Sequence, residues 1–77
     1  MTKTEAAETI AIQVTVFARQ TQQPVTKTAV WEHLSECQSG HRGEYLATAA
    51  KIANHKTVMR RCIADLKLMG DYHLIGA

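Results

Sequence analysis

The fold class of this 77-residue chain is decided by residues 44–72, which read EYLATAAKIANHKTVMRRCIADLKLMGDY. We expect an alanine-rich helix over 44–53, a polar break at Asn54 and His55, and a second helix over about 56–69 that ends at Gly70. Asn54 is expected to close the first of these helices in the left-handed conformation. The second helix carries one apolar stripe, formed at intervals of three or four residues by Val58, Cys62, Leu66 and Met69.

The opposite face of the 56–69 helix is basic. It carries Lys56, Thr57, Arg60, Ala64 and Lys67, with Arg61 at its edge. A helix that is buried on one side and offers arginines and lysines on the other suits insertion into a DNA major groove. The side chains expected to read base edges are Lys56, Thr57, Arg60 and Arg61. Those expected to contact phosphates are Arg42, Lys51 and Lys67.

The charge of the chain is unevenly distributed. Residues 1–40 carry three basic and four acidic side chains, for a net charge of −1, whereas residues 41–77 carry six basic and three acidic side chains, for +3. The basic half therefore contains the predicted recognition segment. The simpler alternative is that this is only a solvated helix face, as charged faces usually are.

The N-terminal segment is predicted to be a helix over 3–20. Thr2 followed three residues later by Glu5 has the form of a capping box. Alternation of apolar residues over 10–16 would fit a strand, but a helical stripe extends over a longer window and its flanks are rich in alanine, glutamate and glutamine. The whole chain, 1–77, is expected to form one domain.

A further helix is predicted over about 26–37, capped by Thr26 or Thr28, and residues 38–43 are expected to form a loop. Three helices between 26 and 69 are expected to close a core around Val30, Leu34, Leu46, Ile52, Cys62 and Leu66. The N-terminal helix would then carry more apolar side chains than one packing face needs, namely Ile10, Ile12, Val14, Val16 and Phe17. Its expected homodimer or partner surface is formed by Ile10, Val14 and Phe17.

The order of these segments resembles the winged helix-turn-helix domains of bacterial transcription regulators over roughly residues 26–76. The resemblance rests on Val25 and Thr26 before an amphipathic helix, the alanine-rich second helix, a KTVMRR opening and an L-x-x-M-G-D-Y exit. It implies a mainly α fold with a tri-helical core, an extra N-terminal helix and a short or truncated C-terminal β wing, with one short strand over 72–75. It also implies that Lys56, Thr57, Arg60 and Arg61 face the groove.

Other classes of function are weakly supported. His33, Cys37 and His41 are spaced as i, i+4 and i+8, but no C-x-x-C pair accompanies them, so we expect no metal and no cofactor. No phosphate loop or nucleophile elbow is present, and an enzyme is not expected. Without a long apolar run or a signal peptide, a cytoplasmic location with reduced thiols is expected.

The sequence thus predicts a small sequence-specific transcription regulator that binds double-stranded DNA, most simply as a homodimer on two half-sites. The alternative is a small helical adaptor that binds a regulatory protein or polymerase subunit through its apolar N-terminal helix, with the basic face meeting an acidic surface. Trp31 is expected to be a core or interface anchor rather than a base-stacking residue.

Overall fold

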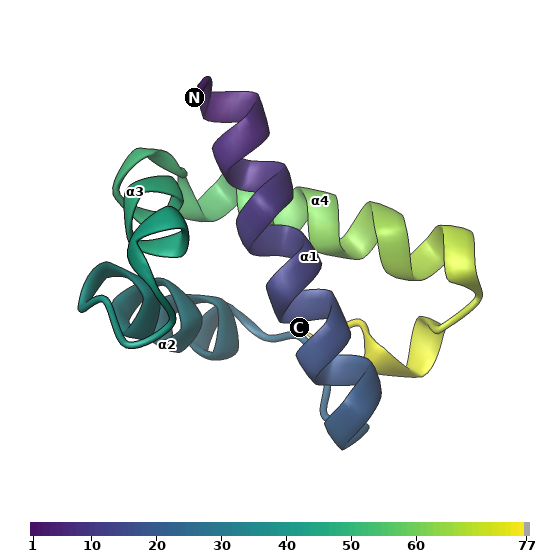
Figure 1. Ribbon diagram of the computed structural model, residues 1–77. Coiled ribbons are helices and arrows are strands. Elements are labelled where there is room, and N and C mark those ends of the chain that lie inside the picture. The colour runs from purple at the N-terminus through teal and green to yellow at the C-terminus, as the bar shows by residue number, and fades with distance from the viewer. Residues whose placement is uncertain (77) are drawn as a thin grey trace.

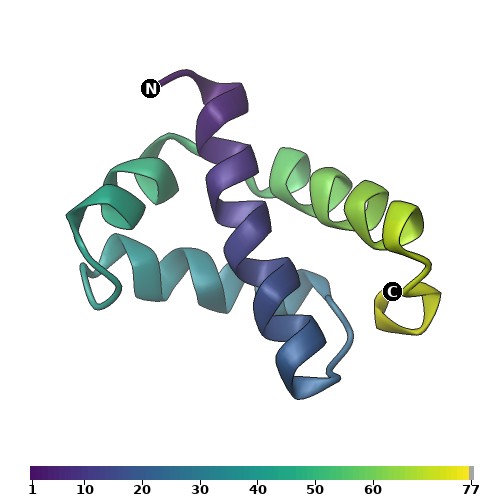
Figure 2. The same cartoon turned by 45° about the vertical axis from the view of Figure 1, so that its right-hand side comes forward.

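The computed structural model of the chain describes residues 1–76 (Figure 1). Its elements in chain order are α1 (Lys3–Thr21), α2 (Lys27–Gln38), α3 (Glu44–Ile52), α4 (His55–Met69) and the short 3-10 helix η1 (Tyr72–Leu74). In two views, α1 runs across the middle of the molecule, with α2 and α3 on one side and α4 on the other (Figures 1 and 2). The mainly α fold predicted from the sequence is confirmed.

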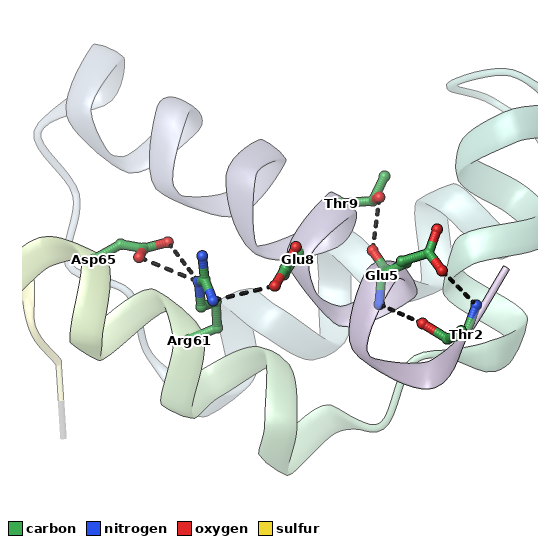
Figure 3. Close-up of polar contacts among 6 residues, drawn as sticks. All are labelled: Thr2, Glu5, Glu8, Thr9, Arg61 and Asp65. Atoms are coloured by element: carbon green, nitrogen blue, oxygen red, sulfur yellow. Dashed lines mark hydrogen bonds and ion pairs between the residues drawn. The ribbon is translucent and has the colours of Figure 1, made fainter.

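The start of α1 is fixed by the predicted capping box. The backbone N–H of Glu5 donates to the Thr2 hydroxyl at 3.1 Å, and the Thr2 N–H donates to the Glu5 carboxylate at 3.4 Å (Figure 3). These two bonds satisfy donors that a helix start leaves without an intrahelical partner. The helical interpretation of the N-terminal segment is therefore confirmed over the strand alternative.

The hydrophobic core depends on α1, contrary to the expectation of a core closed by the three later helices. Ile10 and Val14 are 0% and 2% exposed and belong to the core cluster, so neither belongs to an external partner surface. Phe17 is partly exposed and packs its ring against His33. The reason is geometric: α3 has only nine residues and cannot cover the apolar stripe of α4 alone, whereas α1 is long and lined with alanines that allow close helix approach.

The helices α2 and α3 agree closely with the boundaries and buried residues predicted from the sequence. Thr26, one of the two predicted caps, accepts a hydrogen bond from the N–H of Ala29 at 3.1 Å and starts α2. Val30, Leu34 and Cys37 form its buried row as expected. Leu46 and Ile52 of α3 are partly buried and pack against the core.

The connection between α3 and α4 consists of Ala53 and Asn54. Asn54 is extended, with φ −90° and ψ 133°, so the predicted left-handed conformation is wrong. Its side chain instead accepts hydrogen bonds from the N–H groups of Lys56 at 2.9 Å and Thr57 at 3.4 Å. Asn54 adopts the extended conformation because its side chain then caps backbone N–H groups of α4 that have no partner within the helix.

The predicted β wing is not formed. Gly70 ends α4 in the left-handed conformation (φ 76°), and residues 72–74, expected to be strand, form η1 instead. Leu74 is thereby buried in the core, and the N–H of Val25 donates to its carbonyl at 2.7 Å. Within residues 1–76 the only β pairing is an isolated parallel bridge between Val25 and Ile75. Burial of Leu74 requires the chain to turn back directly after α4, so residues 72–74 form η1 instead of extending away from the core as a strand.

None of the helices within residues 1–76 has the length and apolar character needed to cross a membrane.

Candidate nucleic-acid interface

The prediction that α4 has one buried apolar face and one exposed basic face is confirmed. Val58, Cys62 and Leu66 are completely buried, while Met69, at the end of the predicted stripe, is exposed at the rim of the core. The opposite face is exposed and carries Lys56, Thr57, Arg60, Ala64 and Lys67. We call the three cations of this set, Lys56, Arg60 and Lys67, the basic row. Because the buried stripe anchors α4, these side chains project from a helix whose position is fixed.

The basic row is free of carboxylate partners. Of the four arginines of the chain, Arg19, Arg42 and Arg61 each form an ion pair, with Asp71, Glu36 and Glu8 respectively. Within the described residues, Arg60 forms none, and neither do Lys56 and Lys67. A cation that is not neutralised inside the protein keeps its full attraction for an external anion.

Arg61 has a different role from its neighbour. Its guanidinium lies 3.3 Å from the Glu8 carboxylate on α1 and 3.3 Å from that of Asp65 on α4 (Figure 3). The side chain therefore turns toward α1 and links the two helices. Sequence spacing placed Arg61 at the edge of the basic face, and only the fold brings Glu8 next to it.

The predicted phosphate-binding residues differ in whether they form an ion pair within the chain. The guanidinium of Arg42, in the connection between α2 and α3, donates from Nε and Nη2 to Oε2 of Glu36 on α2, at 3.1 and 2.9 Å. A phosphate contact by Arg42 would have to compete with this ion pair. Lys51 on α3 and Lys67 on α4 are exposed and form no ion pair among residues 1–76.

Sequence reasoning missed a group of residues next to the N-terminus of α4. The Trp31 indole stacks on the His55 imidazole, with ring centroids 4.4 Å apart and an angle of 9° between the planes. Trp31 remains 55% exposed, so it is not a core residue. The Lys27 carbonyl lies 3.3 Å from His55 Nε2, which brings the start of α2 against the start of α4.

Lys27 extends the basic row across two helices. It lines one shallow surface hollow together with His55, Lys56 and Arg60, and a second with Trp31, His55 and Lys56. The positive end of the α4 dipole lies at the same place. The i, i+4 spacing of Lys27 and Trp31 indicates from the sequence that these two side chains lie on one face of α2. Nothing in the local sequence indicates that α4 starts beside them.

The histidines and cysteines do not converge. No group of three or more His, Cys, Asp or Glu side chains that could hold a metal ion occurs in the described part of the chain. His33 is buried against the Phe17 ring, and burial is the main cause that lowers its pKa, with a contribution from Arg42. His41 Nδ1 lies 2.7 Å from the Ser39 hydroxyl in the connection after α2.

Comparisons of the chain with protein-family models, curated protein sequences and solved structures give no match. The assignment of a function therefore depends on the geometry described above.

Proposed function

We propose that this protein is a small DNA-binding domain of the helix-turn-helix type that inserts the exposed face of α4 into the major groove and regulates transcription. The observation that carries the proposal is the basic row, and above all Arg60, the arginine with no carboxylate partner among residues 1–76. The buried stripe of Val58, Cys62 and Leu66 holds α4 in place, which supports its use as a rigid recognition helix whose exposed face enters a groove. The resemblance to winged helix-turn-helix domains supports the same proposal.

Each side chain has a role that follows from its chemistry. Arg60 reads a guanine through a bidentate contact, and Lys56 and Thr57 contact neighbouring base edges. Lys67 and Lys51 contact phosphates, and Lys27 adds a phosphate contact from α2. Arg61 and Arg42 stay with their intramolecular carboxylates and contribute little to affinity.

The stacked pair of Trp31 and His55 lies beside Lys27 and Lys56. In this position the exposed indole packs against the deoxyribose of the strand whose phosphates the two lysines contact. Trp31 is the single tryptophan of the chain, so its fluorescence reports directly on this contact.

The sharpest test compares two adjacent arginines. Arg60→Gln is expected to lose about 1–3 kcal/mol of affinity for a cognate duplex, because it removes a base contact. Arg61→Gln is the matched control, since it makes the same chemical change one residue away at an ion-paired side chain. Both affinities are measured by titrating labelled duplex DNA, with the cognate site first selected from random duplexes at low salt.

Salt dependence separates the phosphate contacts from the base contacts. Replacement of Lys67 by alanine should weaken binding to every sequence alike and reduce the salt slope by about one unit, because roughly one counterion is released for each phosphate neutralised. If wild type and Arg60→Gln bind every duplex equally, or if the wild type binds no duplex at low salt, the proposal is wrong.

A further inference from the structure

The shallow hollow that Lys27 shares with Lys56 and Arg60 is also lined by apolar side chains. These are Met59 and Ile63 of α4, and both are partly buried. Met59 packs against the core, whereas Ile63 lies outside the core cluster of the described chain. The contacts proposed above for Lys56 and Arg60 do not use Ile63, so its place in the hollow requires a separate explanation.

Ile63 lies on the same face of α4 as the basic row. It follows Arg60 by three residues and precedes Lys67 by four, which are the spacings of neighbours on one helix face. Side chains at these spacings have Cβ atoms about 5–6 Å apart, and successive base pairs of a duplex are about 3.4 Å apart. When Arg60 contacts a guanine, Ile63 therefore meets a base edge one or two steps away.

The chemistry of isoleucine restricts which base edge it can meet. Its side chain neither donates nor accepts a hydrogen bond, so a base nitrogen or oxygen placed against it would lose water without gaining a partner. The major groove offers one apolar group, the 5-methyl group of thymine. A hollow lined by Met59 and Ile63 can receive this methyl group, and the contact removes apolar surface of both partners from water.

The charges around the hollow favour duplex DNA as its occupant. Lys27, Lys56 and Arg60 belong to its lining, and none of them forms an ion pair among the described residues. The basic row continues from Lys56 to Lys67, eleven residues further along α4, which corresponds to about 16 Å of helix. A row of this length faces several successive phosphates, which a duplex supplies whatever its sequence.

We propose that Ile63, together with Met59, makes the protein specific for a thymine beside the guanine that Arg60 contacts. The 5-methyl group of this thymine occupies the hollow, while Lys27 and Lys56 contact phosphates at its rim. Ile63 is a specificity-determining residue that acts by apolar contact, in addition to the hydrogen bonds of Arg60. This role rests on the proposed DNA binding by α4 and adds a second base to the recognised sequence.

Replacement of thymine by uracil provides the test, because it removes the 5-methyl group and leaves base pairing unchanged. The probe is the cognate duplex selected from random sequences, with one thymine replaced at a time. The guanine contacted by Arg60 is the one whose replacement weakens binding of the wild type but not of Arg60→Gln. Uracil at a thymine within two steps of this guanine should lower the wild-type affinity about fourfold, the effect of burying one methyl group.

The variants assign this difference to one side chain. Ile63→Ala should bind the thymine and uracil duplexes with equal affinity. Ile12→Ala is the matched control, since it makes the same change at a half-exposed isoleucine on α1, outside the basic row, and should keep the fourfold difference. Ile63→Val is the smaller change and should show an intermediate difference. Circular dichroism of each variant verifies that it is folded.

Three results would overturn the role of Ile63: a uracil effect that persists in Ile63→Ala, no uracil effect near the guanine, or a selected site without thymine there. In each case, a loss of affinity in Arg60→Gln would leave the proposed function standing. A wild type that binds no duplex at low salt would overturn both proposals and assign the hollow to an acidic protein partner.

Discussion

The indole of Trp31 on α2 lies flat on the imidazole of His55, the first residue of α4, with 4.4 Å between the ring centroids. This contact joins two segments that are distant in sequence and fixes the start of α4 relative to α2. Both lysines proposed to hold one DNA strand, Lys27 and Lys56, line the same hollow. The stacking pair therefore connects the stability of the fold with the geometry of the proposed interface.

We expect a favourable coupling free energy between these two rings. In a double-mutant cycle of Trp31→Ala and His55→Ala, the coupling should be about 0.5–1.5 kcal/mol, the range of stacked aromatic pairs. The measurement is urea unfolding of the wild type, both single variants and the double variant. A control cycle pairs Trp31→Ala with Tyr45→Ala, an exposed aromatic residue on α3, and should give additive effects because the ring partner of Trp31 is His55. Additivity in the first cycle would show that the stack adds no stability.

Asn54 should stabilise α4 through its side chain. Because its amide oxygen accepts from the N–H groups of Lys56 and Thr57, Asn54→Ala should lower the free energy of unfolding by about 1 kcal/mol. Asn54→Asp retains an acceptor at the same position and adds a favourable charge at the helix start, so it should equal or exceed the wild type. Equal stability of the alanine and aspartate variants in urea would contradict this account.

The thiol of Cys62 should be unreactive in the folded protein. It is completely buried, its sulfur lies 3.7 Å from the Ala11 carbonyl oxygen, and burial raises its pKa to about 11. In a Cys37→Ala background, DTNB should label Cys62 only as fast as the chain unfolds, and rapidly in urea. Fast labelling under native conditions would show that α1 and α4 separate readily.

The same shift in pKa predicts a loss of stability in alkali. The folded pKa lies above the ordinary value of 9.0, so the stabilisation is fully present below about pH 9 and is lost as pH rises toward about 11. The loss attributable to Cys62 should be about 3 kcal/mol, which corresponds to two pH units. Cys62→Ala should remove this part of the alkaline dependence, at the cost of a cavity that lowers stability at every pH.

His33 should make the fold sensitive to mild acid. Burial, and secondarily Arg42, lowers its pKa below the ordinary 6.5, so its contribution is complete above pH 6.5 and is lost as pH falls through the folded pKa. His33→Phe keeps a ring against Phe17 and removes the titration, and should therefore lose less stability between about pH 7 and about pH 5.5. If wild type and variant lose the same amount, other groups cause the acid sensitivity.

Several features could be predicted from the sequence because they depend on residues only a few positions apart. The capping box of Thr2 and Glu5, the cap at Thr26 and the end of α4 at Gly70 each fix one helix boundary through local hydrogen bonds or backbone conformation. The buried and basic faces of α4 likewise follow from its helical repeat. The proposed base-reading residues Lys56, Thr57 and Arg60 were identified in this way.

The set of helices and the two faces of α4 follow from residues a few positions apart, whereas tertiary packing controls which side chains remain free of an ion pair. Arg60 and Arg61 are adjacent and chemically identical, yet Arg61 pairs with Glu8, which is 53 residues away in the chain. The same holds for Ile10 and Val14, whose burial depends on the later helices that pack against α1, and for Leu74, whose burial turns the expected strand into η1. Helix formation responds to spacing within a few residues, whereas ion pairing and burial depend on segments that meet only when the whole core closes.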